Sequence, residues 1–187
     1  MHGLTISAME PGHLPAFFAY LDDHLRDNGK NGTPLFQPMP RSESFFPADR
    51  KAAFVNGLAT PLGAPGWRRA WIARDAAGAI AGHVDLRARP ERAAAHRVML
   101  GMGVQRDHRR QGLAGRLLHA ARDWAVNETV LDWIDLELLA TNLPARALYL
   151  ANGFVITGEV ADMFHIDGEA LGYTFMTLRL RRDGAGA

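Results

Sequence analysis

The feature that most restricts the fold is a segment near the middle of the chain in which two apolar strands flank one amphipathic helix. Residues 97–104 and 134–139 are mostly apolar, which favours strands. Between them Leu113, Leu117 and Leu118 recur at three- and four-residue spacing, the pattern of a helix with one apolar face. A strand–helix–strand crossover joins parallel strands of one sheet. The segment therefore predicts an α/β fold.

The other patterned segments complete a mixed β-sheet flanked by helices, so the expected class is α/β with an α+β mixed sheet. Their expected bounds are strands at 4–6, 69–74, 79–86, 154–157 and 173–180, and helices at 14–21, 50–58 and 144–151. A chain of 187 residues has the usual size of one domain. We expect a single domain over residues 1–187, with a frayed tail at 181–187.

Residues 27–66 break the regular pattern, and we call them the excursion. Prolines and glycines recur along the excursion, and only residues 50–58 are patterned for a helix. Such segments are usually functional lids or binding loops, or else mobile linkers. Its aromatic side chains, with that of Trp67 directly after it, favour a pocket wall, with a small satellite core beneath the loop as the alternative. These aromatic residues are Phe36, Phe45, Phe46 and Trp67.

Composition excludes several classes of function. The formal net charge of +1 creates no large field, so we expect no nucleic-acid or membrane partner. The absence of cysteine rules out a disulfide, a Cys-ligated zinc site and a thiol nucleophile. His83 and Asp85 lack a third ligand at suitable spacing, so we expect no metal. With no signal-peptide pattern and no membrane-length apolar run, we expect cytoplasmic residence.

The stretch from 105 to 116 joins the first strand to the helix through a basic, glycine-containing turn. Gly112, Ala114 and Gly115 keep the first helical turn small. The unpaired N–H groups there, with the helix dipole, form an anion site that suits a pyrophosphate. The side chains that would add positive charge to this site are Arg109, Arg110 and Arg116.

Arg109-x-x-Gly112-x-Ala114 resembles the (Gln/Arg)-x-x-Gly-x-(Gly/Ala) loop of the GNAT superfamily, which holds the pyrophosphate of coenzyme A. A second similar segment follows at the expected distance, where Asn142-x-x-Ala145-x-x-Leu148-Tyr149-x-x-x-Gly153-Phe154 looks like the helix after the family's next strand. The resemblance extends from about Trp71 to Leu180. It implies a GNAT-like acyl-CoA acyltransferase fold, with acetyl-CoA as co-substrate.

The resemblance also implies which residues contact the cofactor. Met102 and Val104 would pair their backbone with the pantetheine amides, and Asn142 would bond the pantetheine arm or a neighbouring backbone group. Asn142 could equally be only an N-cap, and Tyr149 could simply pack. The full expected cofactor-binding set is Met102, Gly103, Val104, Arg109, Arg110, Gln111, Gly112, Leu113, Ala114, Gly115, Arg116, Asn142, Ala145 and Tyr149.

By the same resemblance Tyr149 would stand beside the thioester sulfur. A phenol with an ordinary pKa of about 10 can give a proton to the departing thiolate. The backbone N–H of Val104 would meet the charge that develops on the thioester oxygen. The attacking amine must be neutral, so a base is needed; Glu137 is the first candidate. The other candidates are Asp85, His83 and His96.

We therefore expect an N-acetyltransferase that transfers an acetyl group to a primary amine by direct attack in a ternary complex. A small-molecule acceptor is favoured. The alternatives are a protein N-terminal or lysine acetyltransferase, and a non-catalytic acyl-CoA-binding module on the same fold. The excursion would form the acceptor-side wall and lid. The acceptor, the physiological acyl chain and the oligomeric state, with a homodimer as one option, stay open.

Overall fold

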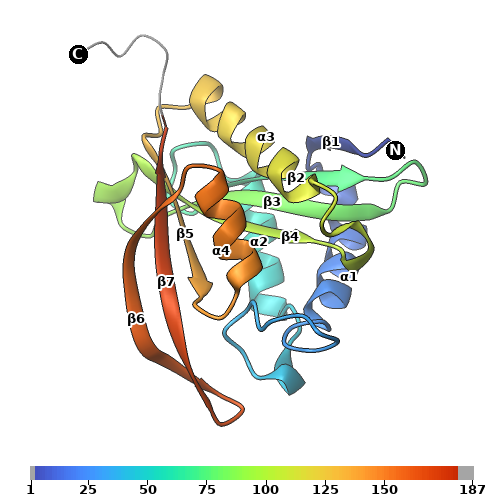
Figure 1. Cartoon of the computed structure of the whole chain (residues 1–187). Helices are drawn as coiled ribbons and strands as arrows, with labels where there is room; N and C mark the ends of the chain where they lie inside the picture. Colours follow the sequence, from blue (N-terminus) through green and yellow to red (C-terminus); the bar gives the residue numbers. More distant parts are fainter. Residues whose placement is uncertain (1–2, 181–187) are drawn as a thin grey trace.

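The structure is a computed structural model that describes residues 3–180, and its centre is a seven-stranded mixed sheet (Figure 1). The strand order is β1-β2-β3-β4-β5-β7-β6. The strands are β1 (Thr5–Ala8), β2 (Arg68–Arg74), β3 (Ile80–Ala88), β4 (Arg97–Val104), β5 (Trp133–Leu139), β6 (Val155–Ile166) and β7 (Glu169–Arg179). The helices are α1 (Leu14–Leu25), α2 (Ala48–Ala59), α3 (Leu113–Glu128) and α4 (Leu143–Ala151). The expected frayed tail at 181–187 lies outside the described residues.

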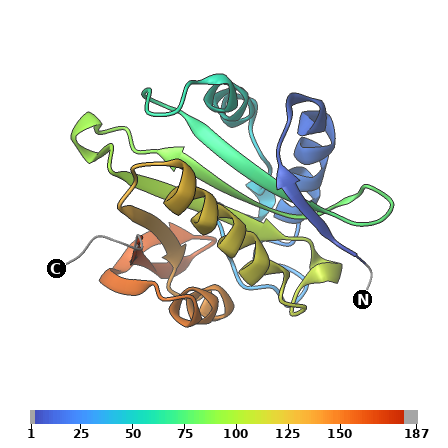
Figure 2. The ribbon, with the colours of Figure 1, turned by 90° about the horizontal axis from the view of Figure 1, so that it is seen from above.

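The predicted crossover is confirmed, because α3 connects β4 to β5 and these two strands pair in parallel. The α3 and α4 helices cover one face of the sheet, and α1 and α2 cover the other (Figure 2). The apolar stripe of α3, including Leu113, Leu117 and Leu118, is buried in the main core against the sheet. Each fully buried leucine contributes roughly 2 kcal/mol to folding, so this stripe fixes the helix that follows the basic turn.

A second apolar cluster lies on the other face, where Phe17 of α1 and Phe54 of α2 meet with ring centroids 4.9 Å apart. Phe46 packs against this cluster. Trp67 does not, since it is buried in the main core near Trp124 of α3, at 6.2 Å between ring centroids. The expectation that Trp67 belongs to a pocket wall in the excursion is therefore wrong, and the satellite-core alternative holds for Phe46.

The C-terminal hairpin is much longer than the sequence indicated. The strand expected at 154–157 runs as β6 to Ile166, and β7 begins at Glu169 instead of Tyr173. Most of β6 is exposed and its pairing with β7 is interrupted by register shifts at Ile156/Gly158 and Val160/Phe164. Because these irregularities remove the two-residue alternation of a half-buried strand, the pattern could not reveal it.

The excursion is a packed loop followed by the predicted helix, α2. Asn28 is fully buried, and its side-chain Oδ1 accepts hydrogen bonds from the backbone N–H groups of Phe36 (2.8 Å) and Gln37 (2.9 Å). These bonds replace the regular pairing that the prolines prevent. Leu35 packs in a small apolar cluster with Leu139 at the end of β5. The loop therefore lies against the sheet.

A second anchor joins the excursion to the turn of the β6–β7 hairpin, beside which the loop runs in Figure 1. Arg41 Nη1 lies 2.9 Å from Asp167 Oδ2, and its Nη2 lies 3.1 Å from Glu169 Oε1. Exposed pairs of this kind contribute about 0–1 kcal/mol. Their effect is to set where the loop rests, between the hairpin and α1.

Candidate active site

The centre of the candidate site is the place where β4 and β5 separate. The two strands pair at residues 97–99 and 133–135 and then diverge, and we call the gap beyond Met99 the splay. On its other edge β4 continues to pair with β3, and Gln105 N donates to Ala81 O (2.9 Å). Backbone groups alternate in direction along a strand. Met102 and Val104 therefore direct theirs into the splay, where the expected cofactor pairing needs them.

The two glycines of β4 are explained by side chains that lie against them. A β-carbon at position 101 would come within 2.7 Å of Asp85 Oδ1, and one at position 103 within 2.8 Å of His24 Nε2. The close approach that these glycines indicated is thus made, at least on this face, by the protein's own side chains. Gly103, expected to contact the cofactor, is a buried residue of β4 that lies against His24 of α1.

The basic turn has the backbone geometry of an open anion site. Gly112 is the N-cap of α3 with a φ of +77°, and no side chain of its own caps the helix. A β-carbon at Gly112 or Gly115 would meet no atom within 4 Å, so both positions are open. Arg110 is exposed and also left-handed (φ +57°), and Gln111 Nε2 braces the turn by donating to Asp107 O (2.8 Å). An anion can therefore approach the first N–H groups of α3.

The remaining members of the predicted loop set differ in accessibility. Leu113 is buried in the core, whereas Ala114 is only partly buried. Arg116 is exposed, and its Nη2 donates to the backbone oxygen of Leu4 at 2.9 Å. Contacts of these residues with pyrophosphate stay predictions.

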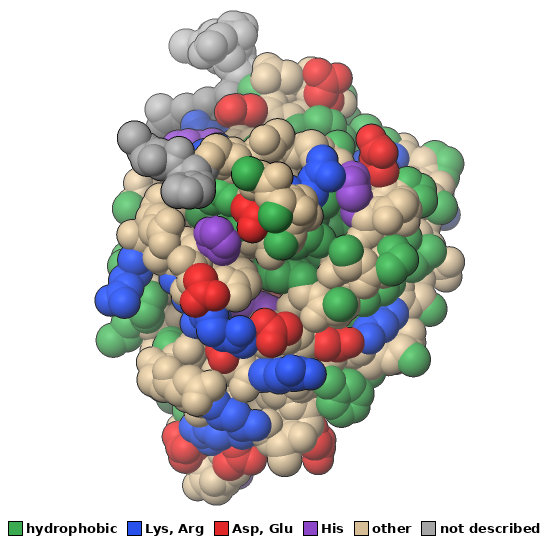
Figure 3. Space-filling model, turned by 90° about the vertical axis from the view of Figure 1, so that its right-hand side faces the viewer, with side chains coloured by type: hydrophobic (Ala, Val, Ile, Leu, Met, Phe, Trp, Pro, Cys, Tyr) green, Lys and Arg blue, Asp and Glu red, His purple; other side chains and the backbone are tan. Residues whose placement is uncertain are grey.

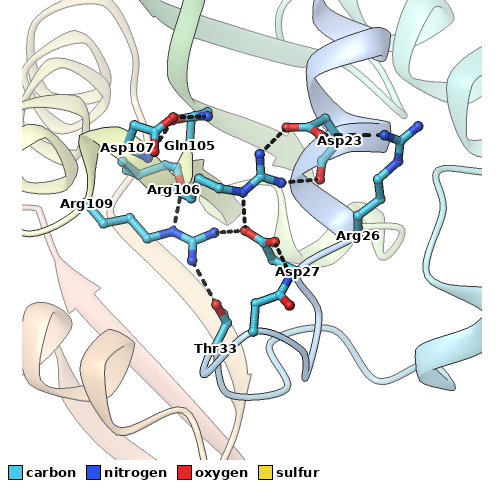
Figure 4. Close-up of polar contacts among 10 residues, drawn as sticks. Asp23, Arg26, Asp27, Thr33, Gln105, Arg106, Asp107 and Arg109 are labelled. Atoms are coloured by element: carbon cyan, nitrogen blue, oxygen red, sulfur yellow. Dashed lines mark hydrogen bonds and ion pairs between the residues drawn. The ribbon is translucent and has the colours of Figure 1, made fainter.

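Arg109 is held by an ion-pair network that the sequence did not indicate (Figure 4). Its Nη2 lies 3.1 Å from Asp27 Oδ2, its Nη1 donates to Thr33 Oγ1 (3.0 Å) and its Nε donates to Val104 O (3.1 Å). Arg106 Nε lies 3.0 Å from the same Asp27 oxygen, and Arg106 Nη1 pairs with Asp23 (2.9 Å). The network ties the excursion to the end of β4.

Asp27 is 2% exposed, which is rare for a carboxylate and requires compensation. Burial acts to raise the pKa of Asp27, but the hydrogen bonds and charges of Arg106 and Arg109 outweigh it and lower that pKa. The predicted contact of Arg109 with pyrophosphate is untested, and the structure adds a structural role for its guanidinium group. In the sequence Asp27 stands directly before Asn28-Gly29, a turn signal, so the pattern indicates a turn and does not reveal the ion pairs of Asp27 with Arg106 and Arg109.

The helix after β5 begins with the predicted cap. Asn142 Oδ1 accepts from the backbone N–H of Ala145 (3.3 Å), so the N-cap role left open by the sequence is confirmed. Tyr149 is 8% exposed and packs against Phe154, with ring centroids 5.4 Å apart. Burial raises the pKa of Tyr149 well above its ordinary value, so the phenol stays protonated at neutral pH and is a weaker acid than a phenol in water.

The four candidate bases lie in different surroundings. His96 precedes β4, at the end of the strand remote from the splay. Asp85 is buried and its Oδ2 accepts from Arg68 Nη1 (2.8 Å). His83 is 7% exposed, and burial lowers its pKa to about 3, which makes it a weak base. Glu137 is exposed on β5 beside the splay.

Two further residues near the splay escaped the sequence analysis. Tyr20 of α1 forms a hydrogen bond with His83 Nδ1 (3.1 Å), and its ring stacks with His24 at 5.8 Å between centroids. The Nδ1 of His24 is buried and has no hydrogen-bond partner within the described part of the chain. Burial lowers the pKa of His24 to about 3. Tyr20 and His24 sit four apart on one face of a helix, but only the sheet register reveals that this face meets Gly103.

Acidic and basic side chains intermingle on the side of the molecule seen in Figure 3, without a continuous patch of one sign. Among residues 3–180 there is no group of three or more His, Asp or Glu side chains arranged to hold a metal ion. Within the same residues, no helix is long and apolar enough to cross a membrane.

A known family matches most of the central part of the chain. A family model described as "Acetyltransferase (GNAT) family" matches residues 38–154, which is more than half of the chain. The match includes the basic turn, the splay and Tyr149. None of the curated proteins compared with the chain matches it.

Solved structures resemble the fold over nearly its whole length. A GNAT-family acetyltransferase from Streptococcus pneumoniae superposes with a TM-score of 0.77 at 23% identity, over 95% of this chain and 99% of that one. A GCN5-related N-acetyltransferase from Kribbella flavida gives 0.73 at 23% identity, over 95% and 98%. A spermidine N-acetyltransferase from Vibrio cholerae, in complex with CoA and spermine, gives 0.70 at 21% identity, over 95% of each chain. At these identities the likeness concerns the fold.

Proposed function

Since the chain belongs to the acetyltransferase (GNAT) family, we propose that it is an acetyl-CoA-dependent N-acetyltransferase whose acceptor is a small primary amine. We assign this activity to a single domain over residues 1–187. The observation that carries the proposal is the splay. The backbone N–H and C=O groups of Met102 and Val104 point into it, beyond the residues at which β4 pairs with β5. A pantetheine chain offers amide groups that can pair with such an edge, as an added strand would.

The chain's own residues fit the rest of the cofactor. The open positions at Gly112 and Gly115 leave room for phosphate oxygens at the first N–H groups of α3. Val104 O already accepts from Arg109 Nε. Within residues 3–180, no strand pairs with the N–H of Val104 or with the backbone groups of Met102 on this edge. This arrangement leaves the Val104 N–H available to a developing oxyanion.

Acetyl-CoA supplies an activated acetyl group, and two side chains would move the protons. Glu137 takes the proton that the amine nitrogen must lose as it bonds to the carbonyl carbon. Tyr149 donates its proton to the sulfur when the carbon–sulfur bond breaks. Of the four candidate bases, Glu137 best combines exposure with a position beside the splay.

The excursion favours a small acceptor over a protein. Asp27 holds it to β4 through Arg106 and Arg109, Leu35 packs on β5, and Arg41 holds it to the β6–β7 turn. A loop fastened along this line bounds the end of the splay. A protein N-terminus or lysine would instead require an open groove.

The test is amine-dependent release of the CoA thiol from acetyl-CoA, with the acetylated product identified by mass spectrometry. The panel contains free amino acids, simple amines, a polyamine and a lysine-containing peptide; the polyamine is included because one similar structure is a spermidine N-acetyltransferase. Release with small amines supports the proposal. Acetyl-CoA binding without release for any member would indicate the non-catalytic module, and release with the peptide alone would indicate a protein-modifying enzyme.

A further inference from the structure

Arg87 of β3 lies over the opening of the splay. A β-carbon at Gly101 would come within 3.2 Å of Arg87 Nη1. Gly101 is the first residue of β4 on this sheet face after the pairing with β5 ends at Met99. The guanidinium group therefore rests on the strand at the point where the splay begins, and its side chain is 39% exposed.

The charge of Arg87 is only partly balanced. Its Nη1 is 3.9 Å from Asp85 Oδ2, beyond hydrogen-bond distance, whereas Arg68 donates to that oxygen at 2.8 Å. Asp85 thus serves two guanidinium groups. A second aspartate is also shared by two arginines, since Arg89 and Arg97 both bond to Asp135. Excess positive charge on a partly exposed fork of donors suits a carboxylate ligand.

Glu137 flanks the splay from the other side. Arg97 of β4 bonds to Asp135, so the residues of β5 that alternate with Asp135 share the sheet face of Arg97 and Gly101. Glu137 is the next of these. Burial and the Glu137 carboxylate raise the pKa of Tyr173 to about 12, and the charge of Arg87 opposes this shift. Both charged groups therefore act on the same phenol.

Apolar surface adjoins the two charges. Tyr173 and Phe175 of β7 meet edge to face at 5.5 Å, and Phe164 meets Tyr173 at 5.1 Å. A hollow of about 290 Å³ lies against β5 and β7. Glu137 and Phe175 line it together with Arg89, Arg97 and Asp135, whereas Arg87 lies outside its lining. This volume is just below the range for small-molecule sites, about 300–1,000 Å³.

On the basis of the function proposed above, we propose that the acceptor is an α-amino acid with an apolar side chain. Arg87 binds its carboxylate, Glu137 faces its ammonium group, and the aromatic row of β6 and β7 contacts its side chain. The substrate class is then an apolar α-amino acid rather than any primary amine, and Arg87 is the residue that determines this specificity. A polyamine would place additional positive charge beside Arg87, which is unfavourable.

The experiment compares L-phenylalanine with 2-phenylethylamine, which differs in lacking the carboxylate, and with spermidine. For the wild-type protein we expect kcat/KM to be roughly 10- to 100-fold higher for phenylalanine, the range for a hydrogen bond to a charged group. Arg87→Gln should remove most of this preference, because it should lower kcat/KM for phenylalanine far more than kcat/KM for 2-phenylethylamine. Arg87→Lys should restore part of it. Arg92→Gln, at an exposed position in the β3–β4 connection, is the charge-matched control.

Three results overturn the inference. Equal or better acetylation of 2-phenylethylamine or spermidine by the wild-type protein would do so while the proposed acetyltransferase function stands. A preference for phenylalanine that survives in folded Arg87→Gln and Arg87→Lys variants would remove Arg87 from the site. Acetyl-CoA binding measured by calorimetry, with no amine acetylated, would reject the proposed function itself. Circular dichroism and thermal unfolding show whether each variant is folded.

Discussion

Replacing Gly112 by aspartate should weaken binding of acetyl-CoA without unfolding the protein. Gly112 has a φ of +77° and open space where its β-carbon would be, so the new side chain meets no atom of the protein. Aspartate tolerates the left-handed region better than most residues, and a negative charge near a helix N-terminus is stabilising by about 0.3–1 kcal/mol. The carboxylate would, however, occupy the space of the pyrophosphate.

The matched control is Gly112→Asn, which has the same size and tolerance of positive φ but no charge. Two like charges about 4 Å apart repel by about 1 kcal/mol in water and about 4 kcal/mol at an effective dielectric constant of 20. Calorimetry should therefore show a dissociation constant roughly 5- to 1,000-fold larger for aspartate than for asparagine. The ratio should shrink as salt is added. Equal constants for the two folded variants at low salt would refute an anion site at this turn.

Three more outcomes are expected. Tyr149→Phe should lower turnover roughly 100-fold or more with little change in acetyl-CoA affinity, measured by steady-state kinetics and calorimetry; full turnover with a lower melting temperature would make Tyr149 a packing residue. The pKa of His83 is about 3 in the fold and about 6.5 in the unfolded chain, so the unfolded state gains the proton first as pH falls. Unfolding free energy from urea titrations should then drop by about 2 kcal/mol between pH 6.5 and 4.5 on account of His83. His83→Gln should lose that share and the exposed control His119→Gln should keep it, whereas identical pH slopes would contradict the assignment. Asp27→Asn should lower stability by roughly 1–3 kcal/mol because it weakens two charged hydrogen bonds, and Asp23→Asn, at a more exposed site, should cost less; the reverse order would show that Asp27 is not the anchor.

The crossover could be predicted because its evidence is local. The apolar spacing of α3, the glycines of the basic turn and the Asn142 cap each act within a few residues of themselves, and the structure confirms the elements they define. The β6–β7 hairpin depends on partners instead. Gly158 and the left-handed Asp162 lie at its irregular points, and only pairing with β7 holds them in a strand. The residue pattern within a short segment does not reveal that pairing.

The candidate site divides along the same line. Glu137 and Tyr149 could be selected because they lie in a predicted strand and a predicted helix that together resemble a segment of the family. Arg87 could not, because its interest comes from resting on Gly101 of the neighbouring strand while Asp85 is already bonded to Arg68. Two arginines on neighbouring strands, Arg68 on β2 and Arg87 on β3, share Asp85, and this is a property of sheet register. It appears only once the strands are aligned.

Arg109 shows how a motif position can carry more than its motif indicates. The pattern places it at the start of the phosphate turn, yet the structure engages Nε, Nη1 and Nη2 with Val104, Thr33 and Asp27 respectively. Moving a guanidinium group that is held at three points costs free energy, because the buried carboxylate of Asp27 would lose one of its charged partners. We therefore expect recognition of phosphate at this turn to depend first on the backbone N–H groups that begin α3. The same three contacts join the excursion to the β4 edge, so the side chain of Arg109 contacts both the wall proposed for the acceptor and the strand proposed for the cofactor.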